Sequence, residues 1–201
     1  MIHLRRSFVA ATVGIALGLA GAAYAQTAPA NASAAAAGAY TIDASHTAVI
    51  ARVPHGNFSY EIFRFGGVAG QLTWNPANAS ANQLDVTIQT ASIQTPVEGF
   101  AAELQGARFL NTAQFPQATF TSTAFRQIDA THAEVDGTLT LKGVANAVTF
   151  HVELIGAGPG QRGGAVIGYH ATTRINNADY SFPGFIRGES EIVVDGEFNR
   201  Q

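Results

Sequence analysis

Apolar and polar residues alternate in short segments along most of the chain from Tyr40 onward, which is the pattern of β-strands with one buried face. In about residues 83–92, for example, Leu84, Val86 and Ile88 alternate with polar residues. Turn sequences such as Lys142-Gly143 separate the segments. The pattern predicts eight strands, at about residues 46–53, 68–74, 83–92, 118–128, 133–141, 147–155, 165–175 and 189–198.

One stretch between the first two predicted strands does not alternate. Residues 56–67 carry five large apolar side chains, and we interpret this stretch as a link rather than a strand. Its side chains suit a ligand-lining wall, a dimer face or a lip that touches a membrane. These residues are Phe58, Tyr60, Ile62, Phe63 and Phe65.

A single helix is predicted in the middle of the chain. Thr95 can cap its first turn, with Pro96 at the first helical position and Glu98 at the third, which is the spacing of a capping box. Apolar residues from Val97 to Leu104 then recur at the spacing of one helical face. A cluster of phenylalanines follows, and Phe115-Pro116 favours an extended conformation before the next strand.

Eight antiparallel strands with short turns must bury their apolar faces and protect their edges. Closure into a barrel removes the edges, and a barrel of this size is filled by side chains or holds one small ligand. A sandwich of two sheets would show the same alternation. The pattern alone leaves both architectures open.

The first 25 residues have the features of a cleavable export signal. Arg5 and Arg6 precede an apolar run from Phe8 to Ala20, and Ala23-Tyr24-Ala25 suits a signal peptidase, so we expect cleavage after Ala25 and a periplasmic protein. The arginine pair fits the twin-arginine route as well as the general one. Residues 26–38 are rich in Ala and uncharged, which predicts a flexible tether, and residues 39–201 form one domain.

Composition narrows the range of functions. The hydrophobic content of 47% excludes a largely disordered chain, and the absence of cysteine excludes disulfides and thiolate metal sites. Without residues 1–25 the chain keeps 9 basic and 14 acidic side chains, a formal net charge of −5. This charge gives no electrostatic reason to expect nucleic acid as a partner.

Four segments in order resemble the YceI-like family, described as lipocalin-like polyisoprenoid-binding proteins. The resemblance covers about Tyr40 to Phe198. The segments are Tyr40-Thr41-Ile42-Asp43-Ala44-Ser45-His46-Thr47 with His55 further on, Ala91-Ser92-Ile93-Gln94-Thr95, the stretch from Phe109 to Phe120, and Val135-Asp136-Gly137-Thr138-Leu139-Thr140-Leu141-Lys142-Gly143-Val144.

The resemblance implies an all-β fold, an eight-stranded antiparallel lipocalin-like barrel with one short covering helix. It also implies a binding or carrier protein, not an enzyme, that holds a polyprenyl chain or an isoprenoid quinone inside the barrel. We expect no cofactor. Transient contact with the inner-membrane surface and a homodimer are both compatible with this reading.

Apolar residues of the predicted inner faces are the candidate ligand-binding wall, and His55 and Arg174 are the polar candidates at a tunnel mouth, where a quinone carbonyl or a phosphate would need a donor. The candidate set is Val49, Ala51, Val53, His55, Phe58, Val86, Ile88, Phe100, Leu104, Phe109, Phe115, Phe120, Leu139, Leu141, Phe150, Val152 and Arg174.

Two alternatives carry less weight. A lipid-acting hydrolase or isomerase could use Asp43, His46 and His55 as acid and base, but no Gly-x-Ser-x-Gly motif accompanies them. Asp43 and His46 are more simply explained by a structural role at the barrel rim, hydrogen-bonded to each other or to the backbone. The histidines show no metal-ligand spacing, so we expect no metal site.

Overall fold

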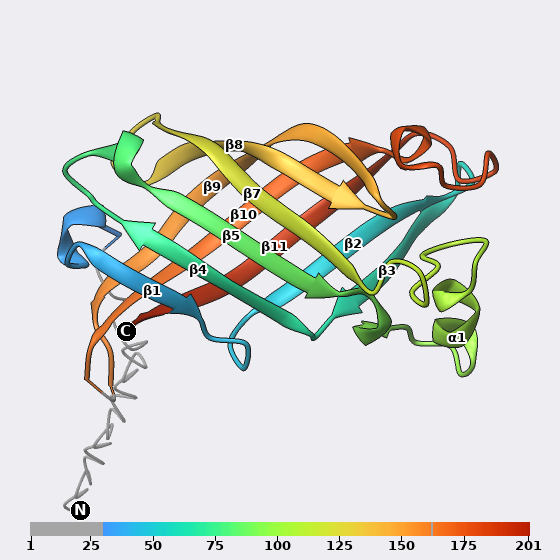
Figure 1. Cartoon of the computed structure of the whole chain (residues 1–201), viewed down its shortest axis with the longest axis horizontal. Helices are drawn as coiled ribbons and strands as arrows, with labels where there is room; N and C mark the ends of the chain where they lie inside the picture. The colour runs from blue at the N-terminus through green and yellow to red at the C-terminus, as the bar shows by residue number, and fades with distance from the viewer. Residues whose placement is uncertain (1–29, 162) are drawn as a thin grey trace, which may run out of the picture.

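The computed structural model describes residues 30–161 and 163–201. The predicted export signal, residues 1–25, and the first part of the predicted tether lie outside these residues. Within them, eleven antiparallel segments form one closed sheet (Figure 1). The segments are β1 Gly38–Ile42, β2 Ala48–His55, β3 Ser59–Phe65, β4 Val68–Trp74, β5 Gln83–Gln89, β6 Ile93–Gln94, β7 Gln117–Gln127, β8 His132–Leu141, β9 Val144–Pro159, β10 Ala165–Asn176 and β11 Glu189–Arg200.

The eleven segments occupy eight positions around the barrel, as predicted. β1 and β2 lie one after the other along β11, whose C-terminal part pairs with β1 and whose N-terminal part pairs with β2. β4 pairs with β1 and β3 pairs with β2, so β3 and β4 share the next position. β5 and β6 share the third position in the same way. Three of the eight positions therefore hold two shorter strands each, and the pairing of β1 with β11 closes the ring.

The aromatic stretch at residues 56–67 is a strand and not only a link, which corrects the prediction. β3 pairs along its whole length with β2. It lacked visible alternation because its outward side chains, Tyr60 and Ile62, are also apolar and are exposed, whereas Phe63 faces inward and is buried.

The helix begins later than predicted. α1 spans Phe100–Gln105, and Gly99 precedes it in the left-handed conformation (φ 78°). The Thr95 hydroxyl donates a hydrogen bond to the Val97 carbonyl (2.8 Å) and does not cap a helix. The predicted capping box at Thr95 is therefore wrong, because the chain turns at residues 96–99 before a helical turn can form. In the part of the chain that the structure describes, no helix is long and apolar enough to cross a bilayer.

The described part of the predicted tether also differs from expectation. Residues Ala32–Ala34 form a short 3-10 helix, η1, capped by the side chain of Asn31. Ala35 is completely buried in the core, and the hydroxyl of Tyr40, itself buried, donates to the Ala36 carbonyl (2.6 Å). Because small alanines fit closely against the barrel, this segment packs on the domain.

Different elements flank the two ends of the barrel (Figure 1). At one end lie the β2–β3 turn, α1 and the loop between β10 and β11, which contains the 3-10 helix η4 (Asn177–Tyr180). At the other end lie η1, the β7–β8 turn, and the turn between β4 and β5 with η2 (Ala79–Ala81). A further short 3-10 helix, η3 (Thr90–Ser92), joins β5 to β6. We call the first end the helix end and the second the turn end.

Candidate functional site: an apolar cavity inside the barrel

The interior of the barrel contains a cavity of about 320 Å³. It is lined from Trp74 and the β7–β8 turn at one end to Leu104 and Ile186 at the other. Along β7 its lining residues run from Ala118 to Gln127, which corresponds to roughly 30 Å of strand. The cavity therefore extends along most of the barrel.

Strand alternation and two bulges direct the apolar side chains into this cavity. In β7 the register shifts between Ser122 and Ala124, so that Phe120 and Phe125 both line the cavity although their positions differ by an odd number. A second shift lies between β9 and β10 at Gly168 and Tyr169. Bulges of this kind keep the inner face apolar along strands that would otherwise change faces.

Twelve of the predicted wall residues line the cavity. They come from β2, β5, β7, β8, β9 and from α1 and the residues after it, and all of them point into the barrel. They are Val49, Ala51, Val53, Val86, Ile88, Leu104, Phe109, Phe120, Leu139, Leu141, Phe150 and Val152.

The two polar candidates for the tunnel mouth do not line the cavity, contrary to expectation. His55 ends β2 at the rim and is exposed to solvent. Arg174 is exposed because its neighbours on β10, Thr173 and Ile175, take the buried face. Its partner across the ladder is Glu191 on β11.

Three predicted aromatic wall residues also lie outside the cavity lining. Phe58 is 94% exposed at the β2–β3 turn. Phe100 packs from α1 against Phe63, with ring centroids 6.0 Å apart, and so supports the wall from behind. Phe115 lies against Gly143, where a Cβ atom would come within 2.6 Å of its ring.

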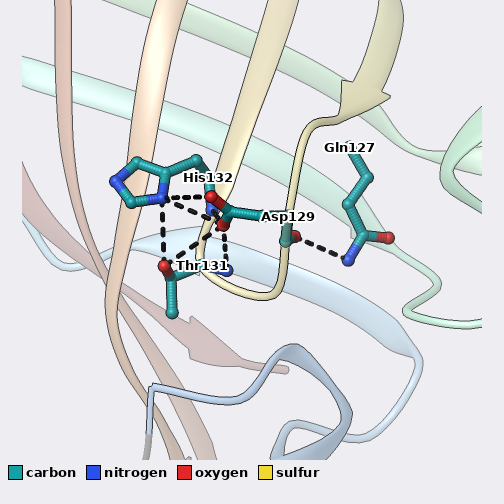
Figure 2. Close-up of polar contacts among 4 residues, drawn as sticks. All are labelled: Gln127, Asp129, Thr131 and His132. Atoms are coloured by element: carbon teal, nitrogen blue, oxygen red, sulfur yellow. Dashed lines mark hydrogen bonds and ion pairs between the residues drawn. The ribbon is translucent and has the colours of Figure 1, made fainter.

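Polar side chains that sequence reasoning missed gather at the turn end of the cavity. Asp129, in the β7–β8 turn, accepts hydrogen bonds from the backbone amides of Thr131 and His132 and lies 2.9 Å from His132 Nδ1 (Figure 2). The Gln127 side-chain amide donates to the Asp129 carbonyl (2.9 Å). Trp74, Asn75 and these four residues all line the cavity. An Asp side chain that accepts from amides two and three residues later forms an Asx turn. The Asp at position 129 was therefore the sequence signal that could have indicated this turn.

These hydrogen bonds lower the pKa of the Asp129 carboxyl group to about 2, with the Thr131 amide as the largest cause and His132 next. The carboxylate is therefore ionised at neutral pH. Because an ionised carboxylate only accepts hydrogen bonds, Nδ1 of His132 must carry the hydrogen that it shares with Asp129.

A second polar cluster lies away from the cavity. Asp43 Oδ2 is 2.9 Å from His46 Nδ1, which is the first of the two structural arrangements expected from the sequence. Hydrogen bonds from Ser45 first, and then from His46, hold the pKa of the Asp43 carboxyl group well below its usual range. Glu197 joins them, with the three potential ligand atoms within 4.8 Å of one another, so this cluster could hold a cation. Neither Asp43, His46 nor His55 lines the cavity, which separates the acid–base set of the enzyme alternative from the cavity.

Comparison with known proteins places this cavity in context. Residues 40–198 match the profile of the YceI-like domain. The protein YceI of Escherichia coli O157:H7 is 37% identical over 172 residues, which cover 83% of this chain and 90% of that protein.

Solved structures show the same barrel. BcnA of Burkholderia cenocepacia superposes with a TM-score of 0.68 at 23% identity, covering 78% of this chain and 98% of that one. A polyisoprenoid binding domain from Saccharophagus degradans superposes with a TM-score of 0.58 at 16% identity, covering 81% and 98% of the two chains.

Proposed function

The chain belongs to the YceI-like domain family, and from this premise we propose that it is a periplasmic carrier of a long apolar isoprenoid-type lipid held inside the barrel. The observation that carries the proposal is the cavity itself, which is long, apolar and enclosed by strands. Among the described residues that line it, none is a lysine or an arginine. The polyisoprenoid binding of a structural neighbour supports the same ligand class.

The energetics favour an apolar chain as cargo. Removing each CH₂ group from water contributes about 0.8 kcal/mol, so a chain of about twenty carbons gains roughly 16 kcal/mol before costs. Association and ordering subtract several kcal/mol from this sum. The remainder is large enough to keep a water-insoluble chain in the barrel, and the export signal predicted at residues 1–25 would place the carrier in the periplasm.

Uptake of a defined ligand tests the proposal. We expect the lipid-free mature protein to solubilise a long-chain isoprenoid quinone at one molecule per barrel, measured by gel filtration and quantitation of the co-eluting quinone. The reason is that the cavity shields a single chain from water. If the protein took up none of three ligands, a quinone, a polyprenyl lipid and an isoprenoid hydrocarbon, the result would contradict the carrier function.

Exposed apolar side chains at the helix end support contact with a membrane surface, where such cargo resides. Phe58, Tyr60 and Ile62 of the β2–β3 hairpin are exposed, as is Phe185 in the loop after β10. The Arg108 guanidinium lies 4.8 Å from the Phe185 ring centroid, and that of Arg52 lies 5.0 Å from the Tyr60 ring. Aromatic rings beside arginines suit the boundary between lipid head-groups and hydrocarbon, and anionic lipids attract the arginines.

Vesicle binding tests this contact. The F58S/F185S variant should lose most of its co-sedimentation with anionic vesicles, because the two most protruding apolar rings are removed. The matched control is I128S/I155S, which removes two exposed apolar side chains elsewhere on the barrel and should leave binding unchanged. Equal loss of vesicle binding in both variants would contradict a specific membrane contact at the helix end. A change from dimer to monomer in F58S/F185S, without vesicle binding by the wild type, would instead make this face an interface between two copies.

A further inference from the structure

Polar side chains line the cavity toward both of its ends, but near the helix end they are already paired within the protein. The Thr90 hydroxyl donates to the Phe115 carbonyl (2.8 Å). The Asn177 amide donates to the Gly188 carbonyl (3.0 Å), and the Ser190 hydroxyl donates to Asn177 Oδ1 (2.7 Å). Thr90, Asn177 and Ser190 are all buried. These groups are satisfied by the fold and leave this part of the cavity suited to hydrocarbon.

The turn end differs because it contains a buried donor without an acceptor. The ring of Trp74 lines the cavity, and its Nε1 is buried with no hydrogen-bond partner among the described residues. Buried unpaired N–H groups are rare in folded proteins and are unfavourable. An indole N–H can only donate, so the complementary group is an acceptor such as an oxygen atom.

The charge at this end restricts that oxygen further. Of the described residues that line the cavity, Asp129 is the single carboxylate, and none is a lysine or an arginine. His132 is held by Asp129 through Nδ1. A phosphate or pyrophosphate would thus come close to an anion without the bidentate cation that such groups usually meet in proteins.

His132 adds a second polar side chain at this end. Its Nδ1 is used in the contact with Asp129. The turn end therefore offers a buried donor at Trp74 beside the polar side chains of the β7–β8 turn on the lining of one cavity, which suits an oxygen-bearing group.

We propose that the head-group of the cargo lies at the turn end, is uncharged, and presents a carbonyl or hydroxyl oxygen to Trp74 Nε1, with the apolar chain extending toward α1. The proposal rests on the carrier function proposed above and adds the chemistry of the head-group. It favours a quinone or a prenol over a prenyl phosphate as cargo.

The protein contains one tryptophan, Trp74, so its fluorescence reports directly on occupancy of this end. The lipid-free mature protein would be titrated with a long-chain isoprenoid quinone, a polyprenyl phosphate of similar chain length, and the hydrocarbon squalene. We expect the quinone to bind at least about ten-fold more tightly than the phosphate, because both can accept from Trp74 but only the phosphate brings a charge into a cavity that is lined by Asp129 and by no lysine or arginine among the described residues. Tighter binding of the phosphate would overturn the neutral head-group while leaving the carrier function intact. Binding of none of the three would overturn the carrier function itself.

Two variants separate the contributions, with bound ligand measured by gel filtration and mass spectrometry. W74F should weaken quinone binding about ten-fold and leave squalene binding within about two-fold, because only the quinone uses the N–H. Equally weakened binding of both ligands would show that Trp74 contributes only apolar contact, which would overturn its role as a hydrogen-bond donor. D129N keeps an acceptor for the turn amides and removes the charge, so it should improve phosphate binding by up to about five-fold at this exposed position. Unchanged phosphate binding would overturn the argument from charge.

Discussion

The A171F variant should lose isoprenoid uptake by at least about ten-fold and yet be more stable than the wild type. Ala171 of β10 lies between Val152 of β9 and Val194 of β11 in the ladder, and all three side chains line the cavity. A phenyl ring added here extends into a space of about 320 Å³ and occupies the path of the chain. Filling an empty apolar space typically raises the free energy of unfolding by about 1 kcal/mol.

Opposite signs for binding and stability distinguish this result from simple misfolding. The matched control is A69F, because Ala69 is exposed on the outer face of β4 and gains the same ring without entering the cavity. Quinone uptake and thermal unfolding would be measured for both variants. Full uptake by A171F would show that the ligand does not pass through the middle of the barrel.

Gly137 of β8 should be the least tolerant glycine in the wall. A Cβ atom at this position would lie 2.4 Å from Phe120 Cζ and 2.5 Å from the Thr121 carbonyl oxygen, next to the register shift in β7. Phe120 cannot move away freely, because its ring is buried and packs edge-on against Phe150, with centroids 5.0 Å apart. We expect G137A to lower the free energy of unfolding by about 3 kcal/mol.

Urea unfolding of G137A beside G184A measures this effect. Gly184 lies in the loop after β10, and an added Cβ would meet no atom within 4 Å. G184A should therefore change the unfolding free energy by less than about 0.5 kcal/mol. Similar stability of the two variants would mean that the β7–β8 wall is looser than the contact distances indicate.

Alternation predicted most of the strands and most of the cavity lining, because it reports directly on which face of a strand is buried, whereas the choice of a barrel came from the resemblance to the YceI-like family. Val86 and Ile88 on β5, and Phe150 and Val152 on β9, show this plainly and all line the cavity. The prediction failed where outward residues are apolar too. Tyr60 and Ile62 are apolar although they are exposed, so β3 showed no alternation and was not predicted as a strand.

The polar end of the cavity could not be assembled from the sequence. Trp74 ends β4 whereas His132 begins β8, and only closure of the barrel brings the two onto one cavity. His55 and Arg174 were chosen for their chemistry. His55, however, lies at the rim and is exposed to solvent, and strand alternation places the Arg174 side chain on the outer face of β10. The short-range part, the Asp129 turn, was accessible from spacing alone.

The most direct test of the proposed carrier function is mass spectrometry of the organic extract from the protein, purified from the cells that produce it without added lipid or detergent. We predict a single isoprenoid lipid at close to one molecule per barrel, with a neutral oxygen-bearing head-group. An extract without any stoichiometric lipid, from a protein that also takes up no isoprenoid afterwards, would contradict the account and leave the cavity without cargo.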